Sequence, residues 1–397
     1  MDPPRAKGVC SDALREARGG AFVRDTWSSE YVPDSATPID LLSQPEAAAR
    51  DLLADHFRGR GAPDFRARQA HGWLYERDAA AFAEMTDLPA AERAALAEAF
   101  AFDAPALERA ERSLDGTVKH LWRMADGELV ESVLIPADRR LTLCLSSQAG
   151  CAMACVFCAT GWSGYRRQLT AGEIVGQFRG ARRWALEHGA GGISNIVFMG
   201  MGEPLMNQRA VFAALDLLNG PYGVGARRIT VSTVGVVPGI LALAERPEQF
   251  RLALSLHAPR PELRGRIVPL ERKYPLPVLM DALLRFNAAG KRRITFEYVM
   301  IDGVNDALEL VADLAALAAQ VSAHVNLIPY NPIPGPDWRP TPTRRVHGFA
   351  EALRRRETNV TVREPRGLDI AAACGQLRAE HELTPPTPFV KLQAADR

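Results

Sequence analysis

The sequence lacks the features of a membrane or secreted protein. None of its hydrophobic runs reaches the roughly 18 uncharged apolar residues that a membrane-spanning helix needs. The first twenty residues, MDPPRAKGVCSDALREARGG, contain no apolar segment of the kind that a secretion signal requires. We therefore expect a cytoplasmic protein that has no association with a membrane.

Lysine is scarce, and the net charge is close to zero. Only 5 of the 48 basic residues are lysine, and the formal net charge of the 397 residues is +1. Such an excess of arginine over lysine is typical of a genome-wide bias and not of selection for phosphate contacts. The charge neither requires nor excludes a nucleic-acid partner. A hydrophobic fraction of 47% predicts a sizeable core, enough for one large domain and a smaller one.

Cysteine occurs only six times, which excludes a dense disulfide framework. In an intracellular chain of this length, so few cysteines indicate metal binding or catalysis. Cys10 stands alone near the N-terminus, where we expect no role for it. The other five are Cys144, Cys151, Cys155, Cys158 and Cys374.

Pattern changes along the chain predict five segments. Residues 1–38 have neither a helical nor a strand period and indicate a flexible extension. Residues 39–110 are rich in Ala and Leu and indicate a small helical domain, with amphipathic helices within 63–78 and 82–100. Connecting strands follow in 111–140, around Val118–Arg123 and Leu129–Ile135. A larger domain in 141–380 and a tail in 381–397 complete the chain.

The larger domain alternates strand and helix patterns. Thr170 and Glu173 form a capping box, which marks the start of the first of these helices. Repeated β/α units with short turns predict a parallel sheet with right-handed crossovers, in the form of a partial (β/α)6 barrel of the α/β class. The six strands are predicted to begin at Leu141, Ile193, Arg227, Arg251, Arg293 and His324.

Polar residues gather where these strands end. Barrels of this type build their active sites on the rim formed by the C-terminal ends of the strands. Five separate segments therefore indicate one shared site. They are Cys151–Cys158, Gly202–Glu203, Ser232, His257 and Asn331.

The cysteines of the string CAMACVFC, which starts at Cys151, have the spacing C-x₃-C-x₂-C. Three thiolates in so short a loop can each bind one iron of a cubane cluster, which leaves the fourth iron open. A structural zinc ion would need a fourth protein ligand, and the nearest downstream histidine is the distant His188. A three-cysteine zinc site and simple buried thiols are the alternatives. The spacing favours an iron–sulfur cluster.

This spacing, with Phe157 before the last cysteine, resembles the radical S-adenosylmethionine superfamily. The MGMGEPLMN string from Met199 resembles that superfamily's glycine-and-glutamate segment. The resemblance narrows to the adenine-C2 RNA methyltransferases (the RlmN family) over about residues 40 to 380. It is carried by FRARQAHGWLY, FAEMTDLP, SSQAGCAMACVFCATG, GMGEPLMN, STVGVVP, SLHAP, NLIPYNP and RGLDIAAACGQL.

The resemblance implies a role for each candidate residue. Cys151, Cys155 and Cys158 would hold one [4Fe-4S] cluster. Cys374 would carry a methyl group, with Cys144 as its partner in a transient disulfide, and Glu131 would be the general base. Residues at the positions that bind S-adenosylmethionine in the family are Gly202, Glu203, Ser232, Ser255, Leu256, His257 and Asn331. Without the resemblance, Cys144 could be a buried thiol, Glu131 a solvated edge-strand carboxylate, and the others satisfied polar residues at strand ends.

The resemblance also implies a reaction and its partners. Two molecules of S-adenosylmethionine are consumed: one methylates Cys374, and the other yields the radical that activates the S-methyl group for addition to C2. The implied substrates are an adenosine in the peptidyl-transferase region of 23S rRNA and the adenosine beside the anticodon of certain tRNAs. An electron donor such as flavodoxin, or a similar reductase, is the expected protein partner, and we expect a monomer.

Two other functions compete with this one. A sister enzyme that methylates adenine C8 and confers antibiotic resistance has the same cysteines, although the helical N-terminal domain and the ATGWSGYRRQLT loop favour the C2 enzyme. A non-catalytic iron–sulfur RNA-binding factor would need no spare cysteines. Contact with RNA is predicted least directly, from four short basic runs: Arg166–Arg167, Arg227–Arg228, Lys291–Arg293 and Arg363–Arg366.

Overall fold

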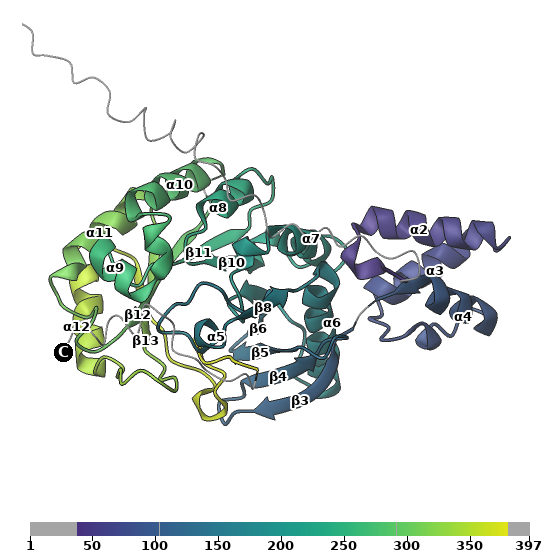
Figure 1. The fold of residues 1–397 in the computed structure, drawn as a ribbon, viewed down its shortest axis with the longest axis horizontal. Helices are drawn as coiled ribbons and strands as arrows, with labels where there is room; N and C mark the ends of the chain where they lie inside the picture. The colour runs from purple at the N-terminus through teal and green to yellow at the C-terminus, as the bar shows by residue number, and fades with distance from the viewer. Residues whose placement is uncertain (1–37, 103, 291, 380–397) are drawn as a thin grey trace, which may run out of the picture. The chain divides into compact units, whose positions relative to one another are not determined.

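A computed structural model of the chain (Figure 1) describes residues 38–102, 104–290 and 292–379. The described residues from Asp40 onward belong to one compact unit. The predicted extension, except for its last residue, and the predicted tail lie outside the described residues, as does Cys10. No helix in the described ranges combines the length and the apolar character needed to cross a membrane.

The segment that follows Asp40 is helical, as predicted. Ala49, Leu53 and Phe57 recur every four residues and are fully buried, which is the pattern of an amphipathic helix. The second helix, predicted within 82–100, is shorter in the structure than expected. Proline disfavours helical backbone in the residue before it, so the helix begins only after Pro89. The elements are η1 (Leu41–Ser43), α2 (Glu46–Gly59), α3 (Phe65–Tyr75), η2 (Phe82–Glu84) and α4 (Ala90–Ala99), and β1 (Ile39–Asp40) pairs with β2 (Phe100–Ala101).

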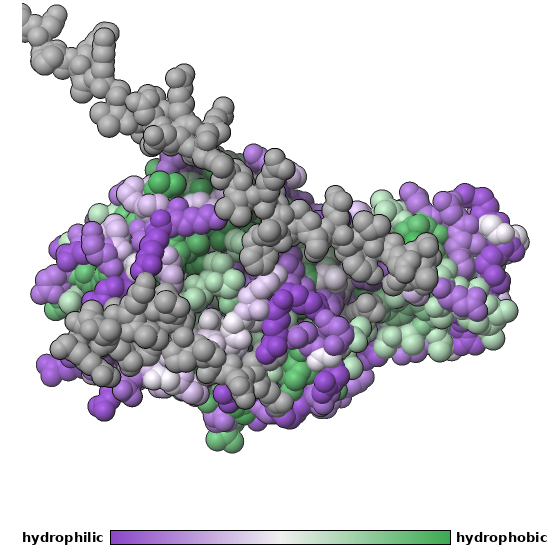
Figure 2. Space-filling model, in the orientation of Figure 1, coloured by the Kyte–Doolittle hydropathy of each residue, from purple (hydrophilic) through white to green (hydrophobic). Residues whose placement is uncertain are grey.

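A shallow groove lies between η2 and α4. Its lining consists mostly of alanines, together with Phe82, Phe100 and Phe102, and its charged residue is Arg93. The surface over α4 is correspondingly pale green in Figure 2. This face of the helical segment is therefore apolar but is formed by small side chains.

Arginines of α6 (Ala171–Glu187) join the helical segment to the barrel. Arg182 forms an ion pair with Asp78, whose side chain is almost fully buried. Arg179 Nη2 donates a hydrogen bond to the carbonyl oxygen of Ala79 at 2.6 Å, and Arg183 donates to that of Asp78. Buried charges of this kind are tolerated only when they are paired. The helical segment is thus fastened to α6 by specific polar contacts.

The centre of the protein is a ten-stranded sheet with the order β14-β13-β12-β11-β10-β9-β6-β5-β4-β3 (Figure 1). The strands from β6 to β14 are parallel, and β3 to β5 extend the sheet as an antiparallel meander. Their bounds are β3 (Ala106–Arg112), β4 (Val118–Arg123), β5 (Leu129–Ala137), β6 (Arg140–Cys144), β9 (Asn195–Phe198), β10 (Ile229–Thr233), β11 (Arg251–Ser255), β12 (Ile294–Met300), β13 (His324–Pro329) and β14 (Val360–Val362).

All six predicted barrel strands are present and in sequential order, which confirms the partial barrel. Within the described residues the sheet stays open, because β3 and β14 are its two edges. These two edge strands were not predicted. β14 is only three residues long, which is too short to show a period, and β3 has the charged sequence ALERAER, which lacks the apolar alternation that marks a half-buried strand.

Helices follow the parallel strands and cover the outer face of the barrel. The first of them, α6, begins at the predicted capping box, in which Thr170 Oγ1 accepts from the Glu173 amide at 3.1 Å and the Glu173 carboxylate accepts from the Thr170 amide at 2.9 Å. The others are α7 (Gln208–Asn219), α8 (Val237–Ala244), α9 (Pro261–Ile267), α10 (Leu276–Ala288), α11 (Leu310–Gln320) and α12 (Thr343–Arg354).

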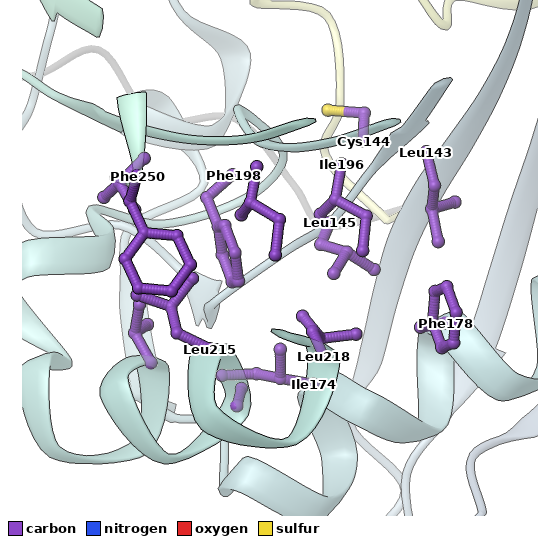
Figure 3. Packing of buried hydrophobic residues seen from close by; sticks show 14 of the residues in the cluster. Leu143, Cys144, Leu145, Ile174, Phe178, Ile196, Phe198, Leu215, Leu218 and Phe250 are labelled. Atoms are coloured by element: carbon purple, nitrogen blue, oxygen red, sulfur yellow. The ribbon is translucent and has the colours of Figure 1, made fainter. Parts of the chain in front are cut away.

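The side chains of β6 alternate between the helix layer outside the barrel and the barrel interior. Leu143 and Leu145 point toward α6 and α7, where they meet buried apolar side chains such as Ile174 and Leu218 (Figure 3). Cys144 lies on the opposite face of the strand in the same view. Successive side chains of a strand point to opposite faces, so the packing of the two leucines places Cys144 toward the barrel interior.

Candidate active site

The three cysteines of the motif lie in a loop that is fixed at both ends. The loop starts after β7 (Gln148–Gly150), which pairs with β8 (Tyr165–Gln168), and it ends at the short helix α5 (Ala159–Trp162). The Cys151 amide donates to the carbonyl oxygen of Gly164 at 2.8 Å, and the Cys158 amide donates to that of Cys155 at 3.2 Å. The cysteines therefore sit on an ordered turn.

Burial raises the pKa of all three thiols, and the neighbouring cysteines raise the pKa of Cys151 and Cys155 further. Such thiols ionise when a cation binds, because metal ligation supplies the charge that stabilises a thiolate. In the described part of the chain, no group of three His, Cys, Asp or Glu side chains is arranged to hold a metal ion by itself. A cubane cluster does not require the three side chains to meet at a single metal ion, since each thiolate binds a different iron. The donor set thus fits an iron–sulfur cluster.

The glycine-and-glutamate segment follows β9 and reaches the cysteine loop. Glu203 is only 3% exposed. One of its carboxylate oxygens accepts from the Leu205 amide at 3.1 Å, and the other accepts from the Val234 amide, in the loop after β10, at 2.8 Å. Burial raises the pKa of Glu203 to about 7. A cationic amine bound beside it would restore the ionised carboxylate, because an opposite charge favours the charged form.

Gly202 places this segment and tolerates no side chain. Its φ is +98°, and an added Cβ would lie 2.5 Å from the Cβ of Gln148. We expect Gly202→Ala to lower the free energy of unfolding by about 1–3 kcal/mol, through backbone strain and steric overlap. If Glu203 binds S-adenosylmethionine, as the resemblance implies, the substitution should also abolish that binding, because Glu203 is displaced. Thermal unfolding and equilibrium dialysis with the ligand measure the two effects.

Gly348→Ala is the matched control for this prediction. Gly348 lies within α12, and an added Cβ would meet nothing within 4 Å. Alanine is a better helix former than glycine, so this variant should be more stable by about 0.5–1 kcal/mol and should bind the ligand normally. Equal behaviour of the two variants would contradict the role assigned to Gly202.

His257, just after β11, offers one ring nitrogen to the site. Its Nδ1 accepts from the Val299 amide at 3.1 Å, which leaves the proton on Nε2. Burial, with a smaller effect from Arg264, lowers the pKa of His257 to about 3, so the ring is neutral at pH 7. Among the described residues the buried Nε2 has no hydrogen-bond partner. The ring packs edge-on against Phe157 of the cysteine loop, with centroids 4.3 Å apart, so this free donor lies beside that loop.

The neighbouring predicted residues contribute in different ways. Ser232 is opposite Ala253 in the sheet register, so Ser232 and Ser255 lie on the same face of the sheet. The side chain of Leu256 is fully buried in the hydrophobic core. Leu256 can therefore contact a ligand only through its main chain.

Asn331 and the cysteine loop both bind the segment that carries Cys374. Asn331 Nδ2 donates to the carbonyl oxygen of Cys374 at 3.0 Å, and the amide of Ala159 donates to that of Gly375 at 2.7 Å. The Oδ1 of Asn331 is buried and has no partner within the described residues, so it is available to a ligand. These contacts bring Cys374, far away in the sequence, to the residue that follows Cys158.

Cys144 and Cys374 also interact with each other. Burial raises the pKa of Cys144, and the charge of Cys374 raises it further, so the two thiols interact electrostatically. Cys374 is exposed, yet the protein atoms around its sulfur still raise its pKa by desolvation, with smaller contributions from Glu297 and Cys158. Both cysteines are free thiols, and Cys144 is buried. The two spare cysteines therefore interact with each other, and Cys374 also interacts with Cys158 of the motif.

Glu131 is buried, and both of its carboxylate oxygens have partners. It is therefore not the solvated edge-strand carboxylate of the alternative interpretation. It lies on β5, an inner strand of the sheet, and is 4% exposed. Its Oε2 accepts from the amides of Arg378 and Ala379 at 2.8 and 2.9 Å, and its Oε1 is 3.3 Å from Nζ of Lys119. Glu131 therefore contacts the C-terminal end of the segment that carries Cys374.

Sequence reasoning missed two buried charged residues near the site. Glu297 on β12 accepts from Asn326 Nδ2 at 2.9 Å, and burial raises its pKa. Arg264 on α9 forms a buried ion pair with Glu271 at 2.6 Å and donates to the carbonyl oxygen of Val234 at 2.6 Å. The sequence could have indicated Glu297 as a candidate site residue, because it is an acidic residue inside the apolar strand ITFEYVM. For Arg264, nothing in the sequence distinguished it from the many other arginines.

Two of the basic runs contain an arginine that is wholly or partly buried. Arg167 pairs with Asp126 and Glu173, and Arg292 is buried and donates to the carbonyl oxygen of Leu243 at 2.7 Å. These two arginines therefore serve the fold, and the expectation of RNA contact is wrong for Arg292. Arg363 and Arg366, which are exposed beside the segment of Cys374, remain candidates.

Comparison with known proteins identifies both the barrel and the N-terminal helical segment. The model of the radical SAM superfamily matches residues 145–315, and that of the ribosomal RNA large subunit methyltransferase N-terminal domain matches residues 47–101. A crystal structure of a radical SAM methyltransferase from Sphaerobacter thermophilus is 44% identical, with a TM-score of 0.82, and the alignment covers 86% of this chain and 100% of that one.

Two curated relatives are similar over nearly their whole length. A probable dual-specificity RNA methyltransferase RlmN from Gemmatimonas aurantiaca is 51% identical over 343 residues, which are 86% of this chain and 93% of the relative. A dual-specificity RNA methyltransferase RlmN from Anaeromyxobacter sp. is 48% identical over 370 residues, which are 90% of this chain and 96% of the relative. With a radical SAM barrel, the matching N-terminal domain and relatives of this identity, the chain belongs to the RlmN family of radical SAM RNA methyltransferases.

Proposed function

We propose that this protein methylates C2 of an adenosine in the peptidyl-transferase region of 23S rRNA and of the adenosine beside the anticodon of certain tRNAs. The observation that carries this proposal is the joining of the Cys374 segment to Asn331 and to the end of the cysteine loop at Ala159. The electrostatic interaction between Cys374 and Cys144 agrees with it. A radical enzyme that did not carry a methyl group on a cysteine would have no use for this pair. The names of the relatives, which act on RNA with dual specificity, agree with it.

The chemistry of adenine explains why a cysteine would carry the methyl group. C2 is an electron-poor carbon that does not attack a methyl sulfonium, whereas a thiolate is a good nucleophile. When bound, a [4Fe-4S] cluster and S-adenosylmethionine supply a 5′-deoxyadenosyl radical. Cys151, Cys155 and Cys158 would hold the cluster, and Cys374 would take a methyl group from another S-adenosylmethionine by displacement. The methyl carbon thus reaches the base through Cys374.

The residues around Cys374 would complete the transfer. Glu131 would accept the C2 proton as a general base. Cys144 would attack the sulfur of Cys374, which releases the methylated base and leaves a Cys144–Cys374 disulfide for an external reductant to reduce. The hydrogen bonds of Glu131 to the segment of Cys374, and the electrostatic interaction of Cys144 with Cys374, support these roles. A flavodoxin or a similar reductase would be the electron donor, and we propose that the enzyme acts as a monomer in the cytoplasm.

Buried polar groups with no protein partner support the S-adenosylmethionine site. His257 Nε2 is a donor and Asn331 Oδ1 an acceptor, and neither has a partner in the described ranges. Glu203 would receive the methionyl amine. Gly202, Ser232, Ser255 and the main chain of Leu256 would complete the site. These polar groups lie around the cysteine loop, where an open iron would bind the ligand.

The test is an anaerobic assay of the cluster-loaded protein with a reductant, S-adenosylmethionine and RNA. We expect 5′-deoxyadenosine and 2-methyladenosine, identified by mass spectrometry of the digested RNA. Detection of 8-methyladenosine instead would assign the protein to C8 chemistry. Absence of 5′-deoxyadenosine from a protein with an intact cluster would favour a non-catalytic RNA-binding factor.

Glu131→Gln tests the role of the base. The variant should keep the cluster and should still methylate Cys374, because glutamine retains an oxygen that can accept from Arg378 and Ala379. It should fail later, since an amide cannot take the C2 proton, and the rate of RNA methylation should fall about 10²–10⁴-fold. Wild-type turnover by this variant would show that another group removes the proton.

A further inference from the structure

The segment that carries Cys374 is tied to the sheet on both sides of the cysteine. On the N-terminal side, Lys119 Nζ donates to the carbonyl oxygen of Ile370 at 2.7 Å. On the C-terminal side, the amides of Arg378 and Ala379 donate to Glu131 Oε2 at 2.8 and 2.9 Å. Residues 370–379 therefore form a loop, here called the Cys374 loop, whose two ends meet the same pair of side chains.

Lys119 and Glu131 are themselves an ion pair, 3.3 Å apart, with side chains only 10% and 5% exposed. Leu121 is opposite Glu131 in the antiparallel register of β4 and β5, so Lys119 is its diagonal neighbour on one face of the sheet. Glu111 on β3 is directly opposite Lys119 and pairs with it at 3.1 Å. Two rigid strands thus present a buried cation and a buried anion to the two ends of one loop.

We propose that Lys119 is a positioning residue, which with Glu131 clamps the base of the Cys374 loop and so holds the Cys374 sulfur at the cysteine motif. The rest of the loop is held by uncharged hydrogen bonds: Asn331, Ala159 and Thr160 donate to its main-chain carbonyl groups, and Gln376 Nε2 donates to the carbonyl oxygen of Pro332. The clamp supplies the charged contacts, which are the stronger ones. This role rests on the proposed function, because it matters only if Cys374 carries the methyl group.

The clamp gives Glu131 a second role besides that of a base. Any variant that removes its oxygens would free the Arg378 and Ala379 amides as well as block proton removal. Lys119 separates the two roles, because it holds the loop without being placed to accept a proton: an ammonium group only donates.

Lys119→Met in the cluster-loaded full-length protein is the test. We expect hydrogen–deuterium exchange of residues 371–379 to be roughly tenfold faster, because charge-assisted contacts that close the loop are lost. Methylation of Cys374 by S-adenosylmethionine, followed by peptide mass spectrometry, should slow by about the same factor. Strand β12 (Ile294–Met300) is the internal reference, and its exchange should not change.

Three further variants make the test specific. Lys119→Arg keeps the charge and the donors and should restore most of the protection and most of the methylation. Lys273→Met, at an exposed lysine, should match the wild type. If Lys119→Met does not fold, Glu131→Ala tests the other half of the clamp, with faster exchange expected at Arg378 and Ala379.

Two results would overturn the proposal: unchanged exchange in residues 371–379 of Lys119→Met, or an equal rise in that loop and in β12, which would indicate general destabilisation. Failure of the proposed function has a different signature. In that case the wild-type protein would not methylate RNA, while Lys119→Met would still loosen the Cys374 loop.

Discussion

RNA should remain covalently attached to Cys144→Ala protein after a single turnover. In this variant Cys374 can still be methylated and can still deliver its carbon to C2, because Cys374 keeps its contacts with Asn331 and its loop. The reaction then stops, since no thiol remains to attack the sulfur that bridges protein and base. The expected result is a band of low mobility on a denaturing gel that disappears after nuclease treatment.

Cys374→Ala should behave differently from Cys144→Ala. It should bind the cluster and S-adenosylmethionine normally, because Cys374 belongs to neither site, yet RNA methylation should be lost entirely. The double variant should show no crosslink, because the bridge is formed through Cys374. A Cys144→Ala enzyme that turns over normally without trapped RNA would mean that the roles of the two cysteines have been misassigned.

Replacing any one of Cys151, Cys155 and Cys158 by alanine should remove the iron–sulfur cluster and all radical chemistry. The wild-type protein, reconstituted without oxygen, should contain about four iron and four sulfide per chain and absorb broadly in the visible range. Each variant should be nearly colourless and should release no 5′-deoxyadenosine, because two thiolates on one short turn cannot hold a cubane. Iron and sulfide analysis with absorption spectroscopy measures this.

Cys10→Ala is the matched control for the cluster variants, because it removes a cysteine outside the motif. It should keep the full iron content and full activity. A colourless, zinc-loaded wild-type protein with complete RNA methylation activity would contradict the radical mechanism. Retention of the cluster by one of the three motif variants would instead show that a different residue completes the ligand set.

The sequence alone determined the elements whose signals are local. Strand β6 and its successors follow from short apolar runs, and α6 from the capping box of Thr170 and Glu173. The cysteine turn also follows from local spacing, because its chemistry is set by residues within a few positions of one another. Edge strands such as β14 were not predicted, because a three-residue strand is defined by hydrogen bonds to its neighbour and not by its own sequence pattern.

The tertiary structure alone decided which distant groups meet. That Glu131 accepts from Arg378 and Ala379, and that Lys119 holds Ile370, depends on contacts between residues about 250 positions apart. The burial that makes His257 a neutral donor, and that removes Arg292 from solvent, is likewise a property of the packed protein. Local sequence specifies backbone preferences and side-chain chemistry, whereas burial and partners arise only when the sheet brings remote segments together.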